Sequence, residues 1–230
     1  MKYFNINTIN KAISLIRDGQ DTKEHVTSRA VSGMLSNYYK PVDNFIVTPE
    51  QTQFGSGKRP DYSIEKFIPN ASDFIPHCFV EVKSLVNSNI DNILDQLYDT
   101  VLFTLDYKGS YSVFMIAVKG TKIAFYTYHN FSSLLDEYGV SHYKGFIPLN
   151  YLVPWTIYSK INNCTLQDYD KYVRLHKFHT DPTNLKDLGA ITNNNISHPH
   201  ILDLLNEKHK EDIHKMFIHI FENASDIFKD

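Results

Sequence analysis

Cysteine and tryptophan are scarce in this sequence, and long apolar runs are missing. The 230 residues include 2 cysteines and 1 tryptophan, and so few cysteines do not supply the disulfide framework of small secreted domains. The most apolar run, VFMIAV at 113–118, is far too short to cross a bilayer. The first residues also lack the sustained apolar segment of a signal peptide. These absences favour a cytoplasmic protein that does not associate with a membrane.

An excess of charge of either sign is also missing. Lys and Arg number 23 against 26 Asp and Glu, which gives a net charge of −3. A basic surface covering the whole molecule is therefore excluded, and nucleic-acid binding would need a local patch. The sequence contains no HExxH and no Cys/His series of zinc-site spacing, and GSGK at 55–58 lacks the frame of a Walker phosphate loop.

Hydrophobic periodicity predicts alternating helices and strands. Helical spacing predicts helices at 21–39, 89–106 and 201–221. Alternating or buried apolar patterns predict strands at 44–48, 60–64, 78–85, 112–120 and 122–129. The first three strands are expected to form an antiparallel meander. The second helix is expected to lie across the sheet. The apolar stripe of the last helix is expected to pack on the core or against a second copy, which makes a homodimer or another partner at the C-terminal helices an open alternative. The predicted domains are a core at 1–150 and a mostly helical extension at 151–230.

Charged residues interrupt one of the predicted buried strands. Glu81 and Lys83 lie within CFVEVKSL at 78–85, and Asp61 follows Pro60 twenty positions before Glu81. Burying an unpaired charge is costly, so these side chains need a partner or a cation. Strand alternation places Glu81 and Lys83 on one face of the sheet. Two interpretations remain open, a catalytic site and a structural ion pair.

The Pro-Asp pair, the Glu-x-Lys sequence and the order of elements resemble the PD-(D/E)xK nuclease superfamily. The resemblance covers about residues 20 to 130. It implies an α/β fold, namely an αβββαβ restriction-endonuclease-like core with a mixed central sheet, followed here by a C-terminal helical extension. It also implies a nuclease that hydrolyses phosphodiesters with Mg²⁺ or Mn²⁺, and a DNA endonuclease is the first expectation.

The resemblance also implies roles for individual residues. Asp61, Glu81 and the backbone carbonyl of Val82 would hold the metal ion, and Lys83 would orient the attacking water or help to deprotonate it. The family often adds an acid from the first helix, where this chain has Glu24. His25 is the alternative, because some cap-snatching viral endonucleases of the superfamily place a metal-binding histidine near that position. Adjacent helical residues point about 100° apart, so one of the two is expected at the ion.

Three further residues are expected to contact the substrate. Lys58 and Arg59 precede Pro60 and would bind phosphate, although basic residues at a turn are usually solvated. Gln96 lies on the helix after the Glu-x-Lys strand, where some relatives carry a Gln followed four positions later by Tyr; this chain has Thr100 there.

The functional alternatives are a non-catalytic module that binds nucleic acid or protein on the same fold, and an RNA endonuclease of the cap-snatching type.

Overall fold

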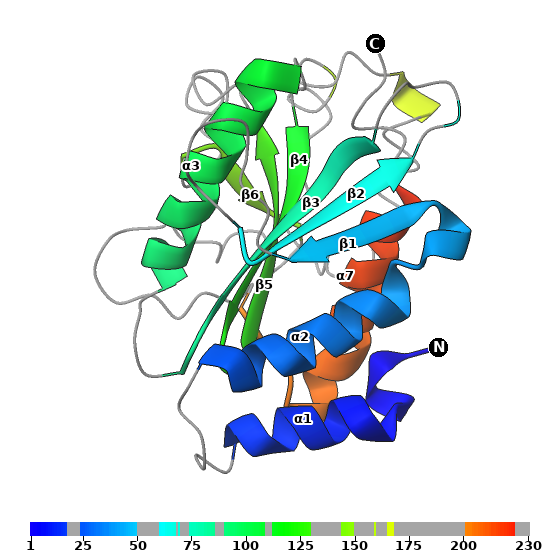
Figure 1. Cartoon of the computed structure of the whole chain (residues 1–230), viewed down its shortest axis with the longest axis vertical. Coiled ribbons are helices and arrows are strands. Elements are labelled where there is room, and N and C mark those ends of the chain that lie inside the picture. The colour runs from blue at the N-terminus through cyan, green and yellow to red at the C-terminus, as the bar shows by residue number, and fades with distance from the viewer. Residues whose placement is uncertain are drawn as a thin grey trace.

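An open, mostly antiparallel sheet organises the computed structural model of the chain (Figure 1). The structure describes residues 1–17, 24–49, 60–67, 69, 74–85, 90–108, 112–129, 144–149, 159, 165–167 and 201–223. The helices of these residues are the 3₁₀ turns η1 (Tyr3–Asn5) and η2 (Pro41–Asp43) and the α-helices α1 (Asn7–Arg17), α2 (Glu24–Tyr38), α3 (Ile90–Lys108) and α7 (Glu207–Glu222). The strands are β1 (Phe45–Pro49), β2 (Tyr62–Phe67), β3 (Phe74–Lys83), β4 (Ser112–Lys119), β5 (Lys122–His129), β6 (Phe146–Pro148) and β7 (Leu202–Asp203).

The described residues form seven strands of this sheet, in the order β1-β2-β3-β4-β5-β6, with β7 paired with β5. β3 and β4 are parallel and α3 connects them, whereas the other pairs are antiparallel. This arrangement confirms the predicted α/β class, the mixed sheet and the antiparallel meander of the first three strands. It places the charged end of β3 beside the end of β4.

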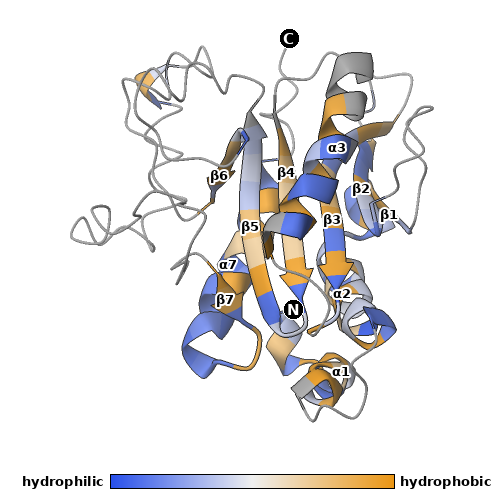
Figure 2. Ribbon diagram, turned by 90° about the vertical axis from the view of Figure 1, so that its left-hand side faces the viewer, coloured by the Kyte–Doolittle hydropathy of each residue, from blue (hydrophilic) through white to orange (hydrophobic). Residues whose placement is uncertain are grey.

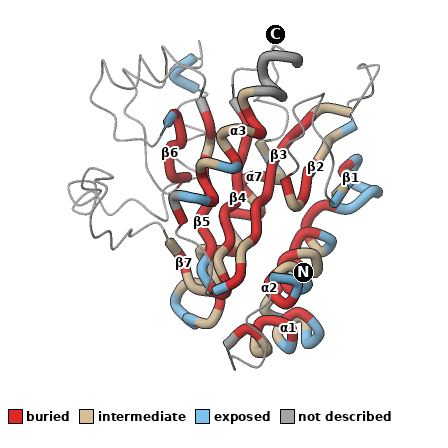
Figure 3. Tube along the Cα trace, turned by 60° about the vertical axis from the view of Figure 1, so that its left-hand side comes forward, coloured by how far each residue is buried: buried red, intermediate tan, exposed pale blue. Residues whose placement is uncertain are grey.

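Each face of the sheet carries its own layer of helices. Strand alternation sends Val80 and Val82 into a core with α1, α2 and α7, while Phe79 joins a core with α3 on the opposite face. Figure 1 shows α1, α2 and α7 gathered together and α3 apart from them. Buried residues run through most of β3, β4 and β5 (Figure 3). Figure 2 shows hydrophobic colour along the middle of the sheet and hydrophilic stretches on α3 and α7.

The C-terminal segment is built into this framework. The prediction of a helix from 201 was wrong at its start, because residues 202–203 pair with β5 and Asn206 caps a helix that begins at Glu207. The apolar stripe of α7 was predicted to pack either on the core or against a second copy. In the structure it is buried in the same core as α1 and α2. The predicted domain boundary at residue 150 stays a prediction, since it falls outside the described residues. Within the described residues, no helix is long and apolar enough to cross a membrane.

Candidate functional site

The site begins where the sheet register brings Asp61 beside β3. Tyr62 pairs with Val80, so the next residue out, Asp61, lies opposite Glu81. The predicted strand at 60–64 included Asp61. In the structure Asp61 directly precedes β2 and is not part of it. The Val82 N–H donates to Asp61 Oδ2 at 2.6 Å, so the carboxylate accepts a hydrogen bond at the end of the ladder. The aspartate is thereby fixed against the strand that carries Glu81.

Three carboxylates from three separate elements converge on the Lys83 ammonium. Lys83 Nζ donates to Glu81 Oε1 at 2.5 Å. It also lies 3.8 Å from Asp61 Oδ2 and 3.7 Å from Glu24 Oε2, which comes from the first turn of α2. We call Glu24, Asp61, Glu81 and Lys83 the carboxylate cluster. The structure therefore brings together the four side chains predicted to be catalytic.

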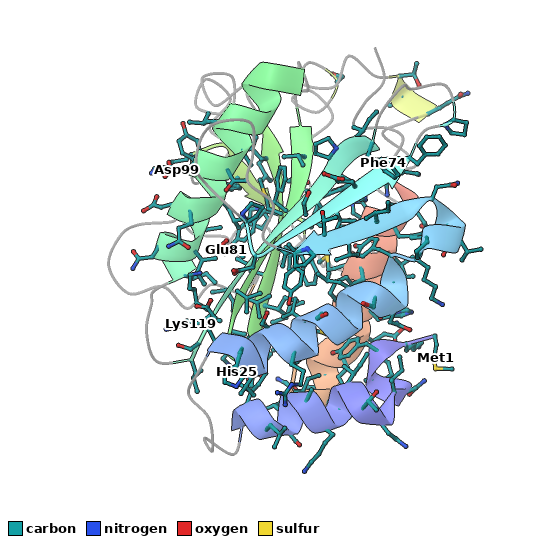
Figure 4. The ribbon with its side chains drawn as sticks, viewed as in Figure 1. Met1, His25, Phe74, Glu81, Asp99 and Lys119 are labelled. Atoms are coloured by element: carbon teal, nitrogen blue, oxygen red, sulfur yellow. The ribbon has the colours of Figure 1, made fainter. Side chains whose placement is uncertain are left out.

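The carboxylate cluster runs from the core to the surface. The side chain of Glu81 is 6% exposed, those of Lys83 and Asp61 are 19% and 23% exposed, and that of Glu24 is 48% exposed. A ligand arriving from solvent would meet Glu24 first and Glu81 last. Figure 4 labels Glu81 beside α3 and His25 at the start of α2, with Lys119 between them in this view.

Burial controls the protonation of the cluster. Burial, together with the negative charge of Asp61, raises the pKa of Glu81 to about 7, even though the hydrogen bond and charge of Lys83 act in the opposite direction. Burial alone would lower the pKa of Lys83, but the hydrogen bond to Glu81 and the surrounding carboxylates outweigh it and raise the pKa. Near neutral pH, Lys83 is thus protonated while Glu81 gains and loses a proton. A group that titrates near neutral pH is suited to proton transfer.

A hydrogen-bonded tether that the sequence analysis missed links α2 to β2. The Tyr62 hydroxyl donates to the Ser28 carbonyl at 3.1 Å and lies 2.6 Å from Ser28 Oγ. Tyr62 follows Asp61, and Ser28 lies one helical turn after Glu24 on the same face of α2. The tether therefore sets the distance between the two outer carboxylates. The available signal was the four-residue spacing of Glu24 and Ser28, which indicates a shared helix face.

The remaining predicted residues have different positions. α2 contacts Lys83 through Glu24, while His25 is exposed at the next position. The side chain of Gln96 is exposed on α3, and its carbonyl accepts a hydrogen bond from Thr100. Lys58 and Arg59 lie outside the described residues.

The Val82 carbonyl has a direction that suits the expected role. In an antiparallel pair, the N–H and C=O of one residue point to the same neighbouring strand. Since the Val82 N–H points to Asp61, the carbonyl faces the β2 side as well. The backbone oxygen and the Asp61 carboxylate are therefore on the same side of β3.

The donor chemistry of the cluster fits a hard divalent cation. Carboxylate and carbonyl oxygens are the ligands that Mg²⁺ and Mn²⁺ prefer, and a cation would stabilise the ionised form of Glu81, which burial disfavours. Among the described residues, no three acidic, histidine or cysteine side chains are already spaced to hold one ion. The Lys83 ammonium lies among the carboxylates instead. Binding a cation between Asp61 and Glu81 therefore requires that this ammonium move aside.

Comparison of the chain with protein-family models, with curated proteins and with solved structures gave no match. The conclusion about function therefore depends on the residues of the carboxylate cluster and their geometry.

Proposed function

We propose that the protein is a Mg²⁺- or Mn²⁺-dependent phosphodiesterase, and specifically a DNA endonuclease with a restriction-endonuclease-like core. The observation that carries the proposal is the convergence of Glu24, Asp61 and Glu81 on Lys83 at one end of the sheet. Three acids and one lysine at a half-buried, solvent-reachable position supply both oxygen ligands for a cation and a group for handling protons.

Each residue of the cluster has a distinct task in this proposal. A bound divalent cation would neutralise charge on the phosphoryl oxygens and favour deprotonation of the attacking water. Asp61, Glu81 and the Val82 carbonyl would hold the cation, and Glu24 would contribute from the solvent side. Lys83, displaced from Glu81, would orient the attacking water or stabilise the negative charge that develops on the phosphate.

A non-catalytic binding module is the second candidate function. The observation that favours it is the short contact between Lys83 and Glu81, in which the two charges pair with each other without a metal ion. Breaking such a pair by removing one partner is strongly destabilising, since the other charge is then left buried and unpaired. Metal binding and cleavage assays separate the two functions.

The test uses substitutions that preserve size at the acids. Asp61→Asn and Glu81→Gln should abolish cleavage of labelled DNA and weaken Mn²⁺ binding measured by calorimetry, because each removes an anionic oxygen. Lys83→Ala should retain Mn²⁺ binding, since a repelling positive charge is gone, yet lower the cleavage rate by roughly 10²-fold or more. Single- and double-stranded DNA and RNA, each with and without Mn²⁺, distinguish the DNA endonuclease from an RNA endonuclease.

A surface ion pair outside the carboxylate cluster provides matched controls. Lys144 Nζ lies 2.7 Å from Asp95 Oδ1, and both side chains are about half exposed. Asp95→Asn and Lys144→Ala should leave cleavage and Mn²⁺ binding as in the wild type. Cleavage by Lys83→Ala at the wild-type rate, or unchanged Mn²⁺ binding by Glu81→Gln, would contradict the catalytic assignment and favour the binding module.

A further inference from the structure

The end of β3 that carries Lys83 is held by the turn between β4 and β5. The N–H of Gly120, the first residue of this turn, donates to the Lys83 carbonyl at 2.9 Å. Gly120 has a φ of 57°, in the left-handed region that residues with a Cβ adopt at a cost. The hydrogen bond therefore depends on a backbone conformation that glycine provides most easily.

Space around Gly120 is also restricted, and the restriction lies on the β3 side. A Cβ at this position would lie 2.8 Å from Leu85 Cδ1, 2.9 Å from Leu85 Cβ and 3.2 Å from Leu85 Cα. Leu85 follows Lys83 by two residues. Because two of these three atoms belong to the backbone or the base of the side chain, rotating the leucine does not remove the overlap. A side chain at 120 would therefore displace the segment that follows Lys83.

The turn is anchored on its other side by the C-terminal segment. The Thr121 carbonyl accepts a hydrogen bond from the Leu204 N–H at 2.9 Å. Lys122 pairs with Asp203 in the sheet register, and its Nζ lies 2.6 Å from Asp203 Oδ2. These contacts oppose movement of the turn away from β3. Strain introduced at Gly120 would consequently be released at the end of β3.

We propose that Gly120 is a positioning residue for Lys83: the turn fixes the end of β3 so that the ammonium reaches the carboxylates, and a side chain at 120 would move it away. The proposal rests on the proposed function for its catalytic consequence, and on the contacts of Gly120 for its structural one. It adds a residue outside the carboxylate cluster on which the alignment of the cluster depends.

The experiment compares Gly120→Ala with Gly33→Ala, a matched glycine substitution on α2. A Cβ at Gly33 would lie 3.2 Å from Ile9 Cγ1, a tight contact that involves no part of β3. The readout that needs no activity is hydrogen exchange of the Val82 amide, which donates to Asp61, with the Ile116 amide of central β4 as the reference for global opening. Gly120→Ala should speed exchange at Val82 by about tenfold or more and leave Ile116 unchanged. Gly33→Ala should not speed exchange of the Val82 amide more than that of the Ile116 amide.

The catalytic arm separates positioning of Lys83 from substrate binding and from folding. In Gly120→Ala, kcat for DNA cleavage should fall on the order of 10²-fold, the scale of a misplacement of about 1 Å, while KM stays as in the wild type. The double variant Gly120→Ala/Leu85→Gly removes the side-chain overlap, and Leu85 is 47% exposed, so its loss leaves the core intact. The positive φ and the 3.2 Å contact with the Cα of residue 85 remain. This variant should therefore recover much, but not all, of kcat and of the slow Val82 exchange, including the case in which Gly120→Ala alone does not fold.

Two results would overturn the proposal. One is slow Val82 exchange in a folded Gly120→Ala protein, and the other is a double variant that behaves as the single one. If the wild-type protein cleaves no nucleic acid, the proposed function fails, and the exchange measurements alone then decide whether Gly120 holds the end of β3.

Discussion

Glu81 is a buried acid whose negative charge the fold tolerates poorly. Its pKa is raised by burial to about 7, above the value of 4.5 for an unperturbed glutamate. A carboxyl group with a raised pKa in the folded state binds its proton more tightly there than in the unfolded state. The tighter proton binding stabilises the folded state. This stabilisation is fully present below about pH 4.5 and is lost as the pH rises through about 7.

Replacing Glu81 by glutamine should remove this pH dependence. The free energy of unfolding of Glu81→Gln minus that of the wild type should increase between pH 4.5 and 7, by roughly 3 kcal/mol if the whole shift is realised. Urea denaturation at a series of pH values measures the difference. A difference that is constant across this range would show that Glu81 titrates normally.

His77 changes the stability of the fold with pH in the direction opposite to Glu81. It is fully buried, its Nε2 lies 2.8 Å from the Ile220 carbonyl, and among the described residues its Nδ1 has no hydrogen-bond partner. Burial lowers the pKa of His77 to about 3, and the charge of Lys66 contributes in the same direction. The unfolded state therefore binds a proton near pH 6.5 that the folded state rejects, and stability is lost as the pH falls below that value.

We expect His77→Phe to reduce sensitivity to acid although it loses the hydrogen bond to α7. The stability advantage of the wild type over His77→Phe should shrink by about 1.4 kcal/mol for each pH unit between 6.5 and 3. Between about pH 4.5 and 6.5 the contributions of His77 and Glu81 to the pH dependence of stability have opposite signs and should largely cancel one another. Guanidinium denaturation from pH 4 to 8 tests both statements, and parallel curves for the two proteins would exclude the assigned role of His77.

At the scale of elements, the contact between α2 and β2 decides whether Glu24 reaches the cluster. The Tyr62 hydroxyl joins the two elements through Ser28. Tyr62→Phe should therefore cost about 1 kcal/mol of stability, the typical net value of one hydrogen bond. It should also weaken Mn²⁺ binding and cleavage far less than Asp61→Asn does, since the inner carboxylates remain in place. Calorimetry and cleavage assays on both variants provide the comparison; a loss as large as that of Asp61→Asn would mean that the tether does more than align α2.

The longer elements were predictable from the sequence because their patterns extend over several turns or alternations. β6 and β7 were not predicted, since strands Phe146–Pro148 and Leu202–Asp203 are too short for alternation to be recognised. Helix α1 was missed because it is rich in Asn, Thr, Lys and Ser, although its buried residues Ile9, Ile13 and Ile16 have helical spacing.

Local patterns predicted the candidate site only where strand neighbours determine it, and Glu24 was predicted from the family resemblance instead. Asp61 and Glu81 become neighbours through an antiparallel pairing that spacing and alternation indicate. The approach of Glu24 depends on how α2 packs, and the contact of Gly120 with Lys83 depends on the parallel pairing of β3 with β4. Both are tertiary facts with no local pattern in the sequence.

At the scale of the whole molecule, the two ends of the described chain share one core. α1 and α7 bury apolar residues in the same cluster, Lys2 Nζ lies 2.7 Å from Glu211 Oε2, and the Tyr38 hydroxyl lies 2.7 Å from His214 Nδ1. Phe217 is 1% exposed and stacks on Tyr38 with ring centroids 4.6 Å apart. The C-terminal helix is thus as much a part of the core as the central strands are.

Phe217→Ala should therefore destabilise the entire fold, by about 3–5 kcal/mol, the usual cost of removing a buried phenylalanine. Leu97→Ala, on the opposite face of the sheet, should cost about 2–5 kcal/mol. In both variants we expect circular dichroism and tyrosine fluorescence to report one coincident transition. Separate transitions for the two probes would indicate that α7 unfolds on its own.

The position of α7 in the chain also determines when the protein can fold. Residues 202–220 are made after every other described element, yet they cover one face of the sheet and anchor the turn that holds the end of β3. While the ribosome is still adding these residues, the apolar side chains of β3 and β4 on that face have no complete cover. We therefore expect the native structure to form only after the C-terminal helix has been translated, because a shorter nascent chain exposes apolar surface that favours aggregation.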